Sequence, residues 1–175
     1  RLFDVPTEGY LGSRIDQDYA PADIHVKREA LLNRLAQELG SFWKDTYLTL
    51  DPDLQKEFSL AMGVRALKNI MLMMMARQGD QSAFELAYEQ YQSTGNMSER
   101  LGALRVLVWN DAPQAEAALR DFYLRFKDEA LSLDQWFTLQ AAHPCATTET
   151  IQYLTSHADY DLGVPNRIRS VSGGL

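Results

Sequence analysis

Residues 96–126, NMSERLGALRVLVWNDAPQAEAALRDFYLRF, decide the fold class of this chain. Apolar residues recur there at helical spacing in two stripes: Leu101, Leu104 and Val108, then Ala115, Leu119, Phe122 and Phe126. Asn96 precedes the first stripe and Asp111 the second, each three residues before a Glu or Gln. Such a pair of side chains can satisfy the free backbone N–H groups at a helix start. The stretch therefore predicts two helices joined by a short turn.

The same helical signals extend over the rest of the chain. Apolar stripes at helical spacing run through Ile24–Phe42, Leu60–Met75 and Phe84–Tyr91. Further helix starts are expected at Asp51-Pro52, Asp80, Ser132, Thr147 or Thr148, and Val164-Pro165. No alternation of period two bounded by hairpin turns is present, and Tyr47-Leu-Thr-Leu50 is expected to end a helix. The predicted fold class is all-α.

The predicted caps also recur at a longer interval. From Asp80 to Asp111 is 31 residues, from Asn96 to Ser132 is 36, and from Asp111 to Thr147 is 36. Two helices with their turns fit this interval, which is typical of stacked antiparallel helix pairs. We therefore predict an irregular superhelical array of helix pairs, an ARM- or HEAT-like solenoid, with a compact bundle as the alternative.

Composition bounds the class of protein. The chain has 175 residues, of which 46% are hydrophobic and 23% charged, as expected for one globular domain over residues 1–175. A net charge of -7 argues against a nucleic-acid surface. The longest apolar run, Ile70–Ala76, is far shorter than a membrane span, so no membrane partner is expected. The single cysteine excludes an internal disulfide and is compatible with a cytoplasmic location.

Few side chains suggest catalysis. The three histidines, His25, His143 and His157, form no His-Glu-x-x-His pair, and no further His or Cys stands at ligand spacing. Cys145 lies two residues after His143, but sequence neighbours seldom orient as nucleophile and base, so a cysteine hydrolase is a weak alternative. We expect no catalytic residue and no metal ligand in the chain.

Large apolar side chains are expected in the core. These are the methionines Met71, Met74 and Met75, on one stripe with Leu67, and the tryptophans Trp43, Trp109 and Trp136. Arg167 and Arg169 are of more interest, because two residues two apart cannot share a helix face and cations at a helix start oppose its dipole. Such an arginine is held either for a ligand or by an ion pair with a neighbouring helix.

Several stretches resemble one known domain. They are residues 2–39, RALKNIMLMMMA at 65–76, QYQSTGNMSERLGAL at 90–104, DQWFTLQA at 134–141 and PNRIRS at 165–170. In this order they resemble the C-terminal helical domain of the M1 family of zinc metallopeptidases, bacterial aminopeptidase N among them. The resemblance implies a superhelical domain that packs on a zinc-containing catalytic domain and closes a large substrate cavity.

The family's zinc ligands and its Gly-x-Met-Glu-Asn loop belong to the catalytic domain, and neither motif occurs in this sequence. Only one residue role carries over: the second arginine of PNRIRS, here Arg169, is expected to face the substrate channel. The resemblance also implies further helices after PNRIRS, so the chain is expected to be an incomplete domain of a larger aminopeptidase and inactive alone, with no cofactor of its own.

The leading hypothesis is therefore a non-catalytic domain that walls the cavity of a cytoplasmic zinc aminopeptidase. Its partners would be the catalytic domain of its own parent chain and, through the parent, peptide substrates. The alternative is a free-standing helical-repeat module that binds a partner protein on its concave face. A monodisperse fragment favours the module, whereas an exposed apolar face favours the larger enzyme.

Overall fold

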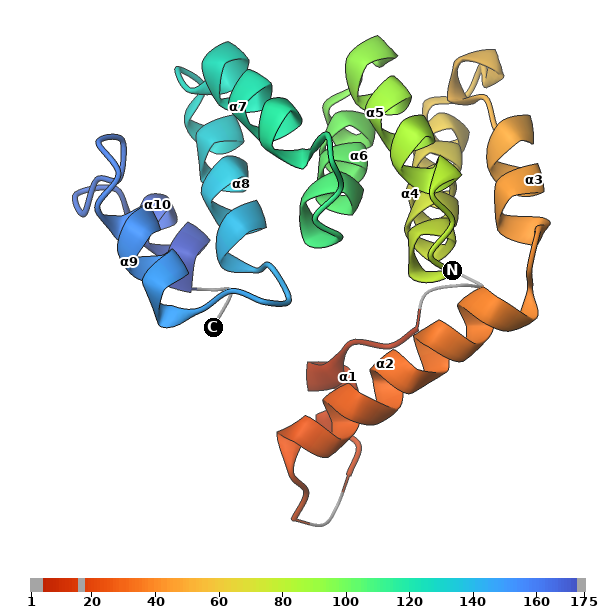
Figure 1. Ribbon diagram of the computed structural model, residues 1–175, viewed down its shortest axis with the longest axis horizontal. Helices are drawn as coiled ribbons and strands as arrows, with labels where there is room; N and C mark the ends of the chain where they lie inside the picture. Colours follow the sequence, from red (N-terminus) through yellow and green to blue (C-terminus); the bar gives the residue numbers. More distant parts are fainter. Residues whose placement is uncertain (1–4, 16–17, 173–175) are drawn as a thin grey trace. The chain divides into compact units, whose positions relative to one another are not determined.

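The computed structural model describes residues 5–15 and 18–172, and every regular element among them is a helix (Figure 1). In chain order the elements are α1 Glu8–Gly12, α2 Pro21–Glu38, α3 Phe42–Thr49, the 3-10 helix η1 Pro52–Leu54, α4 Phe58–Arg77, α5 Ser82–Ser93, α6 Met97–Trp109, α7 Ala115–Phe126, α8 Ala130–Ala141, α9 Thr148–Thr155 and α10 Pro165–Ser172. The all-α prediction is confirmed.

The chain divides into two compact units, residues 1–83 and 84–175, which are described separately. The prediction of a single domain over residues 1–175 stays a prediction. Residues 2–4 and 16–17 of the stretch used for the family resemblance, and the chain end at 173–175, lie outside the described residues.

The core of the first unit forms where α2 and α3 pack on α4. Met71 and Met75 of α4 and Trp43 of α3 are fully buried, which confirms that these side chains belong to the core. The Trp43 indole donates a hydrogen bond of 3.0 Å to the carbonyl oxygen of Ala36, which anchors α3 on α2. Gly40 separates these two helices with a φ of 48°, a left-handed conformation that glycine adopts without strain. The apolar stripe from Ile24 to Phe42 is therefore split into two helices.

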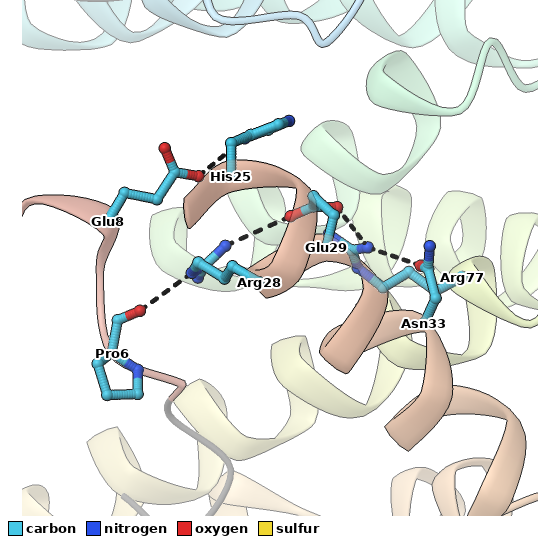
Figure 2. Close-up of polar contacts among 7 residues, drawn as sticks. All are labelled: Pro6, Glu8, His25, Arg28, Glu29, Asn33 and Arg77. Carbon is cyan, nitrogen blue, oxygen red and sulfur yellow. Dashed lines mark hydrogen bonds and ion pairs between the residues drawn. The ribbon is translucent and has the colours of Figure 1, made fainter. Parts of the chain in front are cut away.

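A polar network joins α2 to α4 in the same unit (Figure 2). Arg77 donates to Glu29 over 2.8 Å and to Asn33 over 2.9 Å, while Arg28 donates to the carbonyl oxygen of Pro6 over 3.0 Å. Partial burial works to raise the pKa of Glu29, but the hydrogen bond and charge of Arg77 outweigh it and hold that pKa below its usual value. The network thus fixes the charged form of Glu29 against the end of α4.

Helix α4 also carries exposed apolar side chains in its first turns. Phe58 is 76% exposed, Leu60 51% and Met62 52%. Among the described residues, α4 alone is long and apolar enough to cross a membrane by length and composition, a test that core helices of soluble proteins also pass. The expectation that the chain has no membrane partner stays a prediction.

In the second unit, α6, α7, α8 and α9 pack each on the next along the chain, and α10 returns to pack on α8 and α9. Leu104, Phe122 and Phe137 are fully buried between these helices. Two tryptophans tie neighbours together through their indole N–H groups: Trp109 donates to the carbonyl oxygen of Leu139 over 2.9 Å, and Trp136 to that of Leu119 over 3.1 Å. This serial packing is the arrangement expected of a helical solenoid.

Three of the predicted caps are present. The Asn96 carboxamide accepts hydrogen bonds from the N–H groups of residues 98 and 99 at the start of α6. Thr147 forms a reciprocal capping box with Thr150 at the start of α9, and Asp80 accepts from the N–H of Ser82 over 2.9 Å at the start of α5. Each of these side chains satisfies a backbone donor that the helix itself leaves free.

Two other predicted helix starts, at Asp111 and Ser132, are wrong. Asp111 has a φ of 48° and ends α6, with the Ala112 N–H bonded back to Leu107, so α7 begins only at Ala115. Ser132 lies inside α8, which begins two residues earlier. The predicted start at Asp51-Pro52 is confirmed, because Asp51 caps η1 with Pro52 in its first turn; η1 has only three residues, and the long helix begins at Phe58.

Candidate functional site

The candidate site is α10, which carries both arginines of interest. Pro165 occupies its first turn, and the carbonyl oxygen of Val164 accepts hydrogen bonds from the N–H groups of Arg167 and Ile168 at 3.0 and 3.2 Å. Proline suits this position because its missing N–H would have no partner there and its fixed φ is helical. The predicted helix start at Val164-Pro165 is confirmed.

Arg167 points into the second unit and is 6% exposed. Its Nε lies 2.6 Å from Oδ1 of Asp134 on α8, and its Nη1 donates to the carbonyl oxygen of Asp159 in the loop before α10. The guanidinium also lies over the ring of Phe137, 5.0 Å from its centroid. Arg167 therefore joins α8, α10 and the loop between α9 and α10, as the ion-pair interpretation predicted.

An aromatic cluster lies next to this ion pair. The imidazole of His157 is 5.2 Å from the Trp136 ring, 5.4 Å from the Tyr123 ring and 5.6 Å from the Phe137 ring, centroid to centroid. The Tyr123 hydroxyl donates to the carboxylate of Asp159, and this hydrogen bond, with some burial, raises the pKa of Tyr123. The residues of DQWFTLQA thus build the wall on which α10 rests.

Arg169 is exposed on the opposite side of α10. Its Nη1 lies 3.2 Å from the Asn166 carboxamide oxygen, and among the described residues no carboxylate lies within ion-pair distance of it. The prediction that the two arginines occupy different faces is confirmed. Arg167 is held by an acid of a neighbouring helix, whereas the guanidinium of Arg169 keeps donors available to solvent or to a ligand.

The histidines serve local structure. His143 accepts a hydrogen bond of 3.0 Å at Nδ1 from the backbone N–H of Cys145, so Nε2 carries the proton and donates to the Val108 carbonyl oxygen over 3.1 Å. His25 contacts Glu8 at 2.9 Å on the surface. With both ring nitrogens of His143 engaged by backbone groups, the ring is not placed to activate the exposed thiol of Cys145.

Within the described part of the chain, no three His, Cys, Asp or Glu side chains gather as a metal site. Sequence reasoning missed Asp134, which it treated only as part of a cap and a motif. The sequence does contain a signal for a buried Asp134, since this residue stands beside the apolar Leu133 and Phe137. An acid on an apolar helix face needs a cation as partner when it is buried.

Comparison with known proteins identifies the family of this helical domain. A family described as "Domain of unknown function (DUF3458_C) ARM repeats" matches residues 1–175. The chain belongs to this family of helical-repeat domains. The family's ARM repeats confirm the predicted solenoid class.

Among curated proteins the chain is similar to aminopeptidase N of Escherichia coli, 31% identical over 159 residues, covering 89% of this chain and 18% of that protein. Aminopeptidase N of Caulobacter vibrioides is 31% identical over 157 residues, covering 86% of this chain and 18% of its own length. The chain thus spans less than a fifth of these relatives. The predicted resemblance to aminopeptidase N is confirmed.

A solved structure has the same fold. The crystal structure of Legionella pneumophila aminopeptidase A in complex with aspartic acid superposes with a TM-score of 0.79 at 24% identity, over 99% of this chain and 21% of that chain. This likeness concerns the helical arrangement. In each of these proteins, a segment of this kind is a minor part of a larger polypeptide.

Proposed function

We propose that this chain is the non-catalytic helical domain of a zinc-dependent aminopeptidase that removes N-terminal residues from peptides. The observation that carries the proposal is the family match over residues 1–175 together with similarity to aminopeptidase N over 86–89% of the chain. The sequence contains no His-Glu-x-x-His motif, so zinc and the chemistry would belong to a catalytic domain elsewhere in the same protein.

The domain's own part would be to pack on that catalytic domain and wall the substrate cavity, in the cytoplasm. Exposed apolar side chains in the first turns of α4, Phe58, Leu60 and Met62, support a packing role, because apolar groups of this size are stabilised when a neighbouring surface removes them from water. The partners proposed are the catalytic domain and, through it, peptides.

Arg169 would face peptides in that cavity. Its exposure and its lack of a carboxylate partner among the described residues support this role. A guanidinium can hold a carboxylate or a peptide carbonyl through parallel hydrogen bonds. Asn166, 3.2 Å away, would limit the freedom of the side chain before a peptide arrives.

The first test asks what protein carries this domain. An antibody raised against the chain would capture the native protein from its cells for measurement of intact mass, zinc content and alanyl-arylamide hydrolysis. A much larger, zinc-containing, active protein supports the proposal. A protein no larger than this chain, without zinc or activity, would leave the helical-repeat binding module as the function.

The second test concerns Arg169 in the captured enzyme. Arg169→Ala should raise KM about tenfold for peptides long enough to place a carbonyl or carboxylate on Arg169, because a hydrogen bond to a charged group contributes about 1.5–3 kcal/mol. Zinc content and hydrolysis of alanyl-arylamide, which has no peptide beyond its first residue, should not change. Arg34→Ala, at an exposed arginine on α2, is the control. Unchanged KM on both short and long peptides would remove the channel role.

A further inference from the structure

Side chains of helices α6 and α8 in the second unit line a partly open hollow of about 130 Å³. Its lining residues are Leu101, Arg105, Trp109, Gln135, Thr138, Leu139 and Ala142. Most of these side chains are apolar, and the charged one is Arg105. A single cation at the edge of an apolar hollow is an arrangement that favours a ligand with one anionic group and one apolar group.

Arg105 is held in place without a counterion. Its guanidinium lies over the Trp109 ring, 5.0 Å from the centroid, and that ring is itself fixed by the hydrogen bond of 2.9 Å from its N–H to the Leu139 carbonyl oxygen. Among the described residues no carboxylate lies within 4 Å of the Arg105 guanidinium. Stacking on an aromatic face leaves the in-plane N–H donors of an arginine available.

The surroundings of Arg105 also remove part of its hydration. Although the side chain reaches the surface, desolvation by its neighbours lowers the pKa of the guanidinium. The group stays charged at neutral pH because arginine does not deprotonate in proteins. A partly desolvated cation gains more from an anion than a fully hydrated one does.

A second hollow in the same unit, between α5 and α7 and of about 310 Å³, has its charges paired. There Asp121 accepts a hydrogen bond of 2.7 Å from the Tyr91 hydroxyl and lies 3.4 Å from Arg125. The charges of that hollow neutralise one another within the domain. In the hollow at Arg105, the positive charge of the guanidinium has no such partner among the described residues.

We propose that the hollow between α6 and α8 binds the C-terminal residue of a peptide, with the carboxylate on Arg105 and a small or medium apolar side chain inside the hollow. The exposed carboxamide of Gln135, which has no hydrogen-bond partner among the described residues, can donate to the same carboxylate. A phosphate is a poorer match, because its second charge would need a second cation. An internal Glu or Asp would place only a methylene stem in the hollow.

The site can be tested on the 175-residue chain by NMR of its three tryptophan indole N–H groups. Acetyl-Gly-Gly-Leu with a free carboxylate should shift the Trp109 signal alone, with a Kd on the order of 1 mM. Trp43 and Trp136, both buried, serve as internal references. The C-terminal amide of the same peptide, acetyl-Gly-Glu-Gly-amide and inorganic phosphate should each bind at least about tenfold more weakly.

Two variants test the role of the guanidinium. Arg105→Gln should weaken binding of the free-carboxylate peptide at least about tenfold, and Arg105→Lys should keep part of it, because an ammonium supplies the charge without the fork. Arg125→Gln, at an exposed arginine already paired with Asp121, should bind as the unsubstituted chain does. Equal binding of the amide, the internal-Glu peptide or phosphate would overturn the proposal, as would full binding by Arg105→Gln.

These measurements do not depend on the proposed function. The peptide comparison uses the unsubstituted chain, so a folding defect in a variant cannot produce its result. If the chain binds C-terminal carboxylates but its native protein has no aminopeptidase activity, the carboxylate site stands and the proposed enzyme function is refuted. If the native enzyme is active but the domain binds no carboxylate at Arg105, the proposed function stands and the carboxylate site is refuted.

Discussion

The buried ion pair between Asp134 and Arg167 gives the sharpest prediction on stability. Asp134→Ala removes the carboxylate and leaves a guanidinium whose side chain is 7% exposed without its counterion. Losing one partner of a buried pair destabilises a protein by about 3–5 kcal/mol. Because Arg167 keeps the Asp159 carbonyl and the Phe137 ring, we expect the lower end, about 3 kcal/mol.

Urea unfolding followed by far-UV circular dichroism measures this loss, and hydrogen exchange locates it. The amides of Ser170 and Val171, which are buried on α10, should exchange faster in Asp134→Ala. Asp128→Ala, at an exposed acid, is the matched control and should change the free energy of unfolding by less than about 0.5 kcal/mol.

A double variant separates the ion pair from simple loss of packing. Asp134→Leu with Arg167→Met replaces both charges by apolar side chains of similar size, which is often close to neutral for a buried pair. We therefore expect it to recover most of the stability that Asp134→Ala loses. A loss below about 1 kcal/mol in Asp134→Ala, with exchange at α10 unchanged, would refute the claim that this pair holds α10 on α8.

Three further predictions concern other elements. Asn96→Ala should lower the free energy of unfolding by about 1 kcal/mol, measured by urea titration, because two N–H groups at the start of α6 lose their acceptor. Gly79→Ala should lower it by about 1–2 kcal/mol through backbone strain alone, since φ is 77° and no atom lies within 4 Å of the added methyl group. The pKa of the Glu29 carboxyl is lowered in the folded chain, so its contribution to stability should be complete above the usual pKa of 4.5 and lost as pH falls below that value. In the same acidic range, the thermal unfolding temperature of Glu29→Gln should depend less on pH than that of the unsubstituted chain.

The fold class could be predicted because helix periods and caps are local signals. The side chains of Asn96 and Thr147 bond to backbone groups within three residues, so sequence alone contains both partners. Asp111 shows where this fails, since the same residue type suits a helix start and a left-handed helix end. What decides between them is the tertiary position of α6 and α7, which a cap pattern does not encode.

The candidate site was predictable only in part, for a similar reason. Spacing placed Arg167 and Arg169 on different faces, but the identity of the buried one depends on Asp134, which stands 33 residues earlier in the chain. Arg105 gave no sequence signal, because it lies within an ordinary helical stripe. Its significance arises when α8 brings Leu139 and Gln135 beside Trp109.

Two exposed arginines stand out because they pair with no carboxylate among the described residues, although acidic residues are in excess. The chain has 24 acidic and 17 basic residues, so carboxylates are in excess, and Arg77 and Arg167 each take one across helices. Arg105 and Arg169 do not, and each is instead steadied by a neutral neighbour, the Trp109 ring or the Asn166 carboxamide. A neutral support orders a guanidinium without satisfying its charge. At the two proposed carboxylate sites, a guanidinium that is already ordered would lose less entropy on binding, and its free N–H donors would favour an anion.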